Sequence, residues 1–179
     1  MRRARRDHGE AILGGIDPAI ERHTIALLVD NEAGVLARVI GLFSGRGYNI
    51  ESLTVGEVDA NAGTSRITIV TSGPPQVIEQ IEAQLKRLVP VHAVTNWTFA
   101  TGGLEREMAL VKVAGADRAQ AKRAAEKAGA RVLDDRGAAT VFELTDAPAG
   151  ISSFIEAMRP LGLIDVSRTG VAAISRDTA

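Results

Sequence analysis

Residues 23–47 read HTIALLVDNEAGVLARVIGLFSGRG and carry the strongest secondary-structure signals of the chain. The apolar, β-branched run 23–30 predicts a strand, and the polar residues 31–34 predict a turn. Apolar residues then recur at helical spacing, on one predicted helix face: Val35, Leu36, Val39, Ile40 and Phe43. Glycines at 45 and 47 predict the end of this helix. The stretch therefore predicts a strand, a tight turn and a helix in succession.

The next fifty residues complete this unit. Strands are predicted over 48–59 and 66–71, joined by the turn at 61–63. Two prolines begin a second helix near residue 75, and a final strand is predicted over 91–99. The order β-α-β-β-α-β is that of the ferredoxin-like, or split βαβ, arrangement.

The second half repeats this order with different residues. A strand is predicted over 108–113, followed by a helix that Asp117 caps and Gly129 ends. The remaining predicted elements are hairpin strands at 132–134 and 140–144, a helix over 149–159 and a closing strand over 164–174. We therefore predict an α+β protein of two ferredoxin-like βαββαβ domains.

Composition shifts and glycine-rich segments predict the domain boundaries. They give a mobile N-terminal tail at 1–21, a first domain at 22–99, a linker at 100–106 and a second domain at 107–179. The tail contains arginines and glycines, and its apolar residues follow neither the strand period of about 2 nor the helix period of about 3.6. Its acidic residues and its short apolar run disfavour a targeting peptide.

Charge and composition exclude several classes of protein. The 179 residues include 21 Lys and Arg against 22 Asp and Glu, so no polybasic surface for nucleic acid is predicted. The absence of cysteine excludes disulfides, thiolate nucleophiles and thiolate metal sites, and three scattered histidines make a poor metal cluster. No apolar run approaches the roughly 18 residues of a membrane helix. We expect a cytoplasmic protein with no metal site and no membrane contact.

A search for catalytic groups finds none with a recognisable pattern. The G-x-G at 45–47 ends a helix instead of opening one, so it is no dinucleotide fingerprint. The adjacent Asp134 and Asp135 project to opposite strand faces, and Glu105 and Glu107 are expected to be solvated charges. A triad assembled from distant residues stays open. Single-strand RNA binding is disfavoured because the predicted central strands contain no aromatic stacking residue.

The first strand is apolar on both faces, which bears on assembly. Ile25, Leu27 and Val29 point to one face, whereas Ala26 and Leu28 point to the other. Because the helices of this fold cover one face of the sheet, something else must cover the second face. The second domain, a second copy of the chain and another protein all remain candidates.

The turn between the first strand and first helix has the properties of a ligand site. Backbone N–H groups at a helix N-terminus attract a carboxylate, and Gly34 allows close approach to the backbone. Asn31 offers both a donor and an acceptor, so the turn suits the carboxylate and amino groups of an amino acid. The simpler alternative is that Asn31 only caps the helix and Gly34 only relieves the turn.

Residues 29–55, VDNEAGVLARVIGLFSGRGYNIESLTV, closely resemble the opening of the ACT domain in the small, regulatory subunit of acetolactate synthase, also called acetohydroxyacid synthase. EREMALVKV at 105–113 and SRTGVAAISR at 167–176 resemble the start and end of that subunit's C-terminal domain. The resemblance covers about residues 22–177, and it identifies the first predicted domain as an ACT domain.

The resemblance implies where a ligand binds. In this family, two ACT domains form a dimer that binds valine or a related branched-chain amino acid between the chains. The turn of one chain supplies Asn31, Gly34, Val35 and Leu36, and the partner chain supplies its own copies of two later positions, which in this sequence are Asn49 and Ile50. For Asn49, a local turn after Gly47 remains the alternative.

The resemblance also implies a regulatory role without catalysis by this chain. The family's large subunit carries thiamine diphosphate, magnesium and FAD, and condenses two pyruvates, or pyruvate with 2-oxobutyrate. The small subunit raises that activity and confers feedback inhibition by valine. A freestanding ACT-type amino-acid sensor acting on another partner is the alternative; a small ferredoxin-like hydrolase lacks supporting residues.

Overall fold

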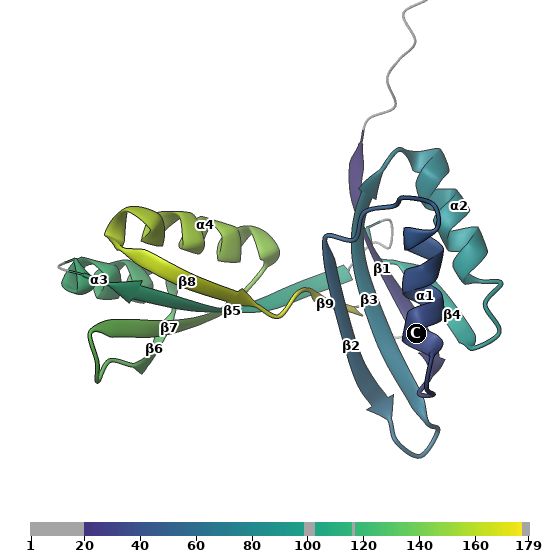
Figure 1. The fold of residues 1–179 in the computed structure, drawn as a ribbon, viewed down its shortest axis with the longest axis horizontal. Coiled ribbons are helices and arrows are strands. Elements are labelled where there is room, and N and C mark those ends of the chain that lie inside the picture. Colours follow the sequence, from purple (N-terminus) through teal and green to yellow (C-terminus); the bar gives the residue numbers. More distant parts are fainter. Residues whose placement is uncertain (1–19, 99–102, 116, 177–179) are drawn as a thin grey trace, which may run out of the picture.

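The computed structural model of the chain describes residues 20–98, 103–115 and 117–176. Its first half contains six elements in the order β1 (Glu21–Asp30), α1 (Val35–Ser44), β2 (Ser52–Asp59), β3 (Thr64–Gly73), α2 (Pro75–Leu85) and β4 (Val91–Asn96). The four strands form an antiparallel sheet in the order β2-β3-β1-β4, with both helices on one face (Figure 1). The predicted ferredoxin-like order is confirmed. The predicted tail lies outside the described residues up to position 19.

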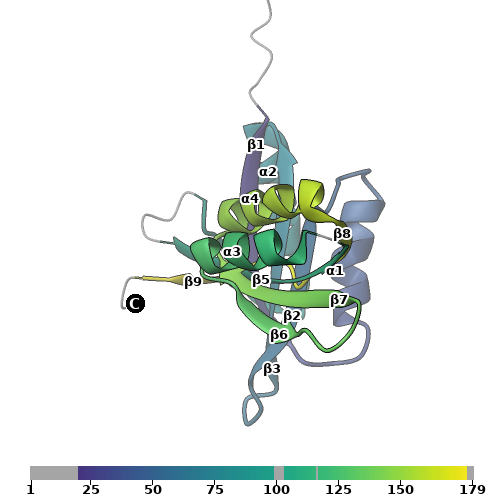
Figure 2. The same cartoon turned by 90° about the vertical axis from the view of Figure 1, so that its left-hand side faces the viewer.

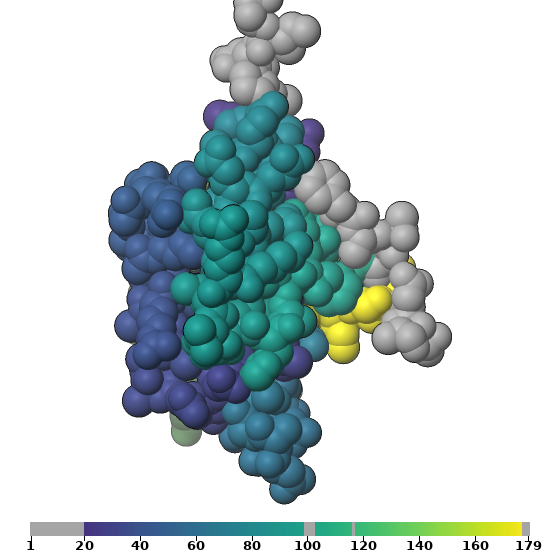
Figure 3. Space-filling model, turned by 90° about the vertical axis from the view of Figure 1, so that its right-hand side faces the viewer, coloured from purple at the N-terminus to yellow at the C-terminus, as the bar shows by residue number. Residues whose placement is uncertain are grey.

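The core of this half lies between the sheet and its two helices. Helix α1 buries every fourth residue from Val35 to Phe43, and α2 buries Ile78, Ile81 and Leu85 at spacings of three and four. The fully buried residues of this core are Ile25, Leu27, Val29, Val35, Val39, Phe43, Ile67, Ile69, Ile78, Ile81 and Leu85. Figure 3 views the molecule from this side and shows the two helices covering the sheet.

The second half builds a sheet of the same order from β5 (Gly103–Ala114), β6 (Arg131–Asp134), β7 (Ala139–Asp146) and β8 (Leu163–Arg168). Helices α3 (Arg118–Ala128) and α4 (Pro148–Met158) lie together on one face of this sheet (Figure 2). A short 3-10 turn, η1 (Arg159–Leu161), follows α4. The structure therefore confirms a second βαββαβ unit.

Two polar details of this half differ from the prediction. Asp117 occupies the N-cap position of α3, but its side chain makes no capping hydrogen bond, so its predicted role as a cap is wrong. Asp135 is not simply a solvated strand end. It accepts hydrogen bonds from Lys122, Thr140 and Arg118, and these hold the pKa of its carboxyl well below the usual range. The resulting cluster ties the β6–β7 turn to α3.

Strand β5 is longer than expected and replaces most of the predicted linker. The linker was predicted over 100–106, but residues 103–106 pair with a ninth strand, β9 (Ala172–Ser175). The remainder of β5 pairs with β7 and β8 in the second sheet. The glycine-rich sequence therefore forms a strand here because a partner from the far end of the chain supplies its hydrogen bonds, which periodicity alone does not reveal.

The closing strand predicted over 164–174 is divided in two. Strand β8 ends at Arg168 and β9 begins at Ala172, with Gly170 between them at φ +83°. A left-handed residue of this kind breaks the ladder and redirects the chain. As a result, β8 belongs to the second sheet while β9 joins the outer part of β5.

The ribbon of β5 and β9 lies against the face of the first sheet that the helices leave open (Figure 1). Arg22 of β1 forms an ion pair with Glu105 at 3.2 Å, and Val171 is hydrogen bonded to β2. Outer-face residues of the first sheet, including Ala26 and Thr68, are buried. The second domain, a second copy of the chain and another protein were the candidates to cover this face. The second half of the same chain therefore covers at least part of it.

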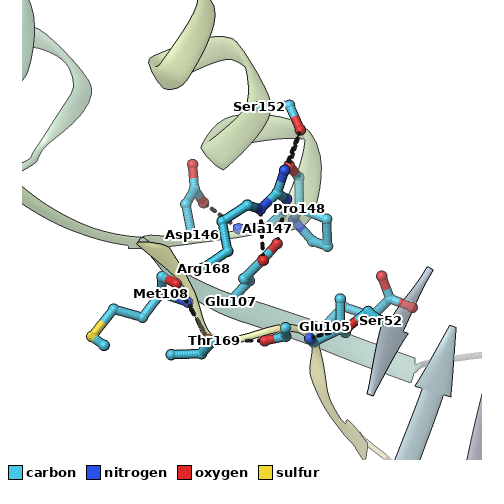
Figure 4. A network of polar contacts seen from close by, with 12 residues as sticks. Ser52, Glu105, Glu107, Met108, Asp146, Ala147, Pro148, Ser152, Arg168 and Thr169 are labelled. Carbon is cyan, nitrogen blue, oxygen red and sulfur yellow. Dashed lines mark hydrogen bonds and ion pairs between the residues drawn. The ribbon is translucent and has the colours of Figure 1, made fainter. Parts of the chain in front are cut away.

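A partly buried ion pair joins β5 to the end of β8. Arg168 donates to both carboxylate oxygens of Glu107, at 2.7 and 2.5 Å, and also contacts Ser152 of α4 at 3.4 Å (Figure 4). The Glu107 side chain is 3% exposed, so its predicted role as a solvated charge is wrong. Its hydrogen bonds raise the pKa of Arg168 above the usual value.

We expect Arg168→Met to lower the free energy of unfolding by about 2 kcal/mol, because it leaves a buried carboxylate without its partner. The loss is smaller than for a fully buried pair, since the Arg168 side chain is 38% exposed. Urea denaturation measures the change.

Arg131→Met is the matched control, because Arg131 binds Glu143 through the same two-point geometry but is 70% exposed. Exposed pairs contribute little, so this variant should unfold at nearly the wild-type urea concentration. Equal effects of the two substitutions would contradict the proposed difference.

Candidate functional site

The turn between β1 and α1 is held by backbone contacts, and Gly34 forms the helix N-cap. The Asn31 N–H donates to the Gly63 carbonyl at 2.7 Å, which ties the turn to the β2–β3 hairpin. Gly34 has φ +88°, a conformation that favours glycine. The alternative in which Asn31 caps the helix is therefore wrong, whereas the role of Gly34 in relieving the turn is confirmed.

The side chain of Asn31 is oriented by a residue that sequence reasoning missed. Its Nδ2 donates to Oε1 of Glu57 at 3.0 Å. Asn31 is exposed, and among the described residues no donor bonds its Oδ1. The register of the β2–β3 hairpin is the signal that could have predicted this contact. Glu57 pairs with Ser65, and Ser65 pairs with Val29, which lies two positions before Asn31.

The N-terminus of α1 is uncapped and open. No side chain among the described residues caps it, and its first turn contains no acidic residue. A Cβ placed on Gly34 would meet no described atom within 4 Å. Because the first backbone N–H groups of a helix lack intrahelical partners and carry partial positive charge, this end of α1 suits a carboxylate.

Val35 and Leu36 continue from the turn but face different surroundings. The Val35 side chain is buried in the first core, so only its backbone faces the turn. Leu36 is 36% exposed and lies beside the uncapped helix end. The turn therefore brings together Asn31, Gly34, Val35 and Leu36, with one apolar side chain at the surface.

Asn49 and Ile50 lie at the other end of α1. They belong to the segment between α1 and β2, where the Asn49 carbonyl accepts a hydrogen bond from Thr71 and Ile50 packs against the first core. The ten residues of α1 span about 15 Å. Within one chain the structure therefore does not bring Asn49 and Ile50 to Gly34. Figure 1 shows the α1–β2 segment leaving α1 at the end opposite to the β1–α1 turn.

Segment 48–51 was predicted as strand but forms an irregular connection between α1 and β2. The Tyr48 N–H donates to the Phe43 carbonyl at 3.0 Å, and Glu51 is the first residue to bond the backbone of β3. Strand β2 consequently begins at Ser52. This irregular segment leaves the Asn49 side chain exposed.

Two histidines lie near the sheet ends. His92 is exposed and bonds Asp30 at 2.6 Å, beside the candidate turn, while His23 is buried next to Asn96.

Over residues 20–98, 103–115 and 117–176, no group of three or more His, Cys, Asp or Glu residues could hold a metal ion. Over the same residues, no helix combines the length and apolar character needed to cross a membrane.

Both halves of the chain match models of known protein families. Residues 25–93 match the model described as "AHAS small subunit-like ACT domain", which defines the first half as an ACT domain. Residues 106–177 match the model described as "Small subunit of acetolactate synthase". The chain belongs to the family of acetolactate synthase small subunits.

Individual relatives agree along nearly the whole sequence. The chain is 40% identical over 159 residues to the acetolactate synthase isozyme 3 small subunit of Escherichia coli K12, covering 87% of this chain and 96% of that protein. It is 40% identical over 157 residues to a probable acetolactate synthase small subunit of Archaeoglobus fulgidus, covering 87% and 97%.

A solved structure extends the similarity to the fold. The crystal structure of the acetolactate synthase small subunit from Thermotoga maritima is 34% identical, with a TM-score of 0.79. The match covers 89% of this chain and 99% of that one. The two-domain architecture is therefore shared with a small subunit of known structure.

We expect Gly34→Asp to fold with an intact first domain, because the space around a new side chain is open. The positive φ should cost about 1 kcal/mol of unfolding free energy. Circular dichroism and urea denaturation measure both effects.

Gly129→Asp provides the control, since Gly129 at the end of α3 also has positive φ and no described atom near its Cβ position. Gly34→Asp should lose less stability than Gly129→Asp, because its carboxylate lies at the positive end of α1, whereas that of Gly129→Asp lies at the negative end of α3. Loss of helical signal in Gly34→Asp alone would show that the turn tolerates no side chain.

Proposed function

We propose that this chain is the regulatory subunit of an acetolactate synthase, which raises the activity of the catalytic subunit and confers inhibition by valine or a related branched-chain amino acid. The observation that supports this most strongly is the uncapped α1 N-terminus beside open Gly34 and Asn31. It occurs in a chain whose two halves both match the small-subunit family.

The chemistry of the turn matches the two charges of an amino acid. In this proposal, the ligand carboxylate accepts from the N–H groups of the first turn of α1 that follow Val35, because the Val35 N–H already donates to the Glu32 carbonyl at 3.3 Å. The ammonium group donates to Oδ1 of Asn31 and lies near the carboxylate of Glu57, which orients that amide. Leu36 offers apolar surface to an aliphatic side chain.

A second copy of the chain would complete this site. Asn49 and Ile50 are separated from Gly34 by the length of α1, so they can join the ligand only if they come from a partner. We therefore infer a homodimer formed through the ACT domains, with each site shared between two chains. Occupancy of the site is then linked to how the two domains pack together.

Regulation requires that the ligand bind one arrangement of the complex more tightly than another. Valine can lower catalytic activity only if the inhibited arrangement of the dimer and its catalytic partner has the higher affinity. In this proposal thiamine diphosphate, magnesium and FAD are held by the catalytic subunit, and this chain supplies no reacting group.

Reconstitution tests this function directly. We expect the purified chain to form no acetolactate from pyruvate with all three cofactors present, yet to stimulate its catalytic subunit. Valine should reverse that stimulation. Stimulation is read from acetolactate formed per catalytic subunit as the chain is titrated; no change in that rate would contradict the proposal.

Gly34→Asp should abolish valine inhibition while stimulation persists. Two like charges about 4 Å apart repel by roughly 1 kcal/mol in water and about 4 kcal/mol at an effective dielectric near 20. Valine affinity should therefore fall by roughly five- to a thousandfold. Gly34→Asn controls for size and backbone strain without charge, and it should retain more sensitivity. Wild-type inhibition of Gly34→Asp would refute the site.

Chemical cross-linking tests the shared site, because the chain contains no cysteine of its own. A double variant, Asn31→Cys with Asn49→Cys, treated with a short bismaleimide should give covalent dimers on a denaturing gel. Each single variant should give far fewer. Exclusively monomeric product, together with a monomer mass near 18.9 kDa by light scattering, would exclude the dimer.

A further inference from the structure

The bend between β8 and β9 is attached to β2 by two hydrogen bonds to a single residue. The Val171 N–H donates to Ser52 Oγ at 3.0 Å, and Thr54 Oγ1 donates to the Val171 carbonyl at 2.8 Å. Val171 is 3% exposed, so both of its backbone groups depend on these two side chains. We call Ser52, Thr54, Gly170 and Val171 the β2 clamp.

Gly170 makes this close approach possible. A Cβ at this position would lie 2.6 Å from Ser52 Oγ and 3.0 Å from Thr54 Cγ2. The backbone of the bend therefore rests directly on β2, with no room for a side chain between them. A displacement of β2 by even an ångström breaks both hydrogen bonds, since their strength falls steeply with distance and angle.

The clamp lies between the candidate ligand segment and the second domain. Ser52 follows Ile50 by two residues along the chain. On the other side, the Thr169 N–H donates to the Met108 carbonyl at 3.0 Å, and the Met108 N–H donates to Thr169 Oγ1 at 3.1 Å. The preceding Arg168 binds Glu107 and Ser152 (Figure 4). A continuous series of contacts thus runs from the start of β2 to β5 and α4.

Apart from the packing of the β5–β9 ribbon against the first sheet, which buries Ala26, Thr68 and Ala173, two grooves border the junction. A groove of about 1080 Å³ borders the clamp at Ser52, and another of about 420 Å³ borders it at Thr54. The remaining ion pair across the junction, Arg22 with Glu105, is partly exposed and so contributes little. The clamp therefore supplies the two directional hydrogen bonds between β2 and the bend, beside the non-directional packing of the ribbon.

We propose that the β2 clamp carries the effector signal from the ACT domain to the second domain. Ligand contact with Asn49 and Ile50 shifts the start of β2, and Ser52 and Thr54 pass this shift to the bend at 169–171. This inference rests on the proposed function, because it names the route by which the same ligand acts. The proposal predicts that a change in the clamp alters inhibition by valine without altering valine affinity, which makes it testable.

Ser52→Ala with Thr54→Val removes both hydrogen bonds and keeps the side-chain volumes similar. Calorimetry on the full chain measures valine affinity, and the reconstituted complex reports stimulation and inhibition. We expect valine affinity within about threefold of wild type, but maximal inhibition reduced to less than half. Thr145→Val with Ser153→Ala removes two exposed hydroxyls of the second domain and should behave as wild type.

The outcomes separate the two proposals. Full inhibition of the clamp variant by valine would overturn the proposed role of the clamp. Loss of valine binding by this variant would also overturn it, because the clamp would then shape the ligand site instead of transmitting a signal from it. Failure of the wild-type chain to bind valine instead refutes the proposed function. Thr54→Ser retains the hydroxyl and should retain inhibition, which keeps the test valid if the double variant is unstable.

Hydrogen exchange tests the same route without the catalytic subunit. In the wild-type chain, valine should change the exchange rate of the Val171 amide, which donates to Ser52. Ser52→Ala should exchange faster at this amide and show no response to valine. An amide at Val171 that ignores valine in the wild-type chain would overturn the inference.

Discussion

Covering the outer face of the first sheet is the constraint on which the rest of the architecture depends. Two helices can cover only one face of a four-stranded sheet, and β1 is apolar on both. The chain meets at least part of this need with its own distant segments, the first residues of β5 and all of β9. This solution explains why β5 is long, why the closing strand breaks at Gly170 and why Val171 finds its partners on β2.

Local signals were sufficient to predict both βαββαβ units, because each depends on apolar periods and on glycine or proline at element ends. Errors arose where a distant segment supplied the partner. The glycine-rich residues 103–106 resemble a linker until β9 pairs with them, and Glu107 resembles a solvated charge until Arg168 reaches it. Such pairings connect residues about sixty or more positions apart, which local periodicity cannot reveal.

The candidate site was likewise predictable where it depends on local sequence and not where it depends on distant residues. Gly34 could be predicted because a tight turn into a helix demands a particular backbone, and its φ of +88° agrees. Glu57 was missed because its approach to Asn31 depends on the register of a hairpin partner. The separation of Asn49 from Gly34 follows from the length of α1 and shows why one chain cannot present the whole set of residues.

The continuity of β5 has a mechanical consequence. Because this strand begins against the first sheet and ends inside the second, it acts as a lever whose fulcrum lies near the clamp. The part from Glu107 to Ala114 extends about 25 Å at the usual rise per residue, so a tilt of roughly 5° displaces its far end by about 2 Å. A small rotation at the fulcrum is thereby enlarged into a displacement of ångströms at the far end of the strand.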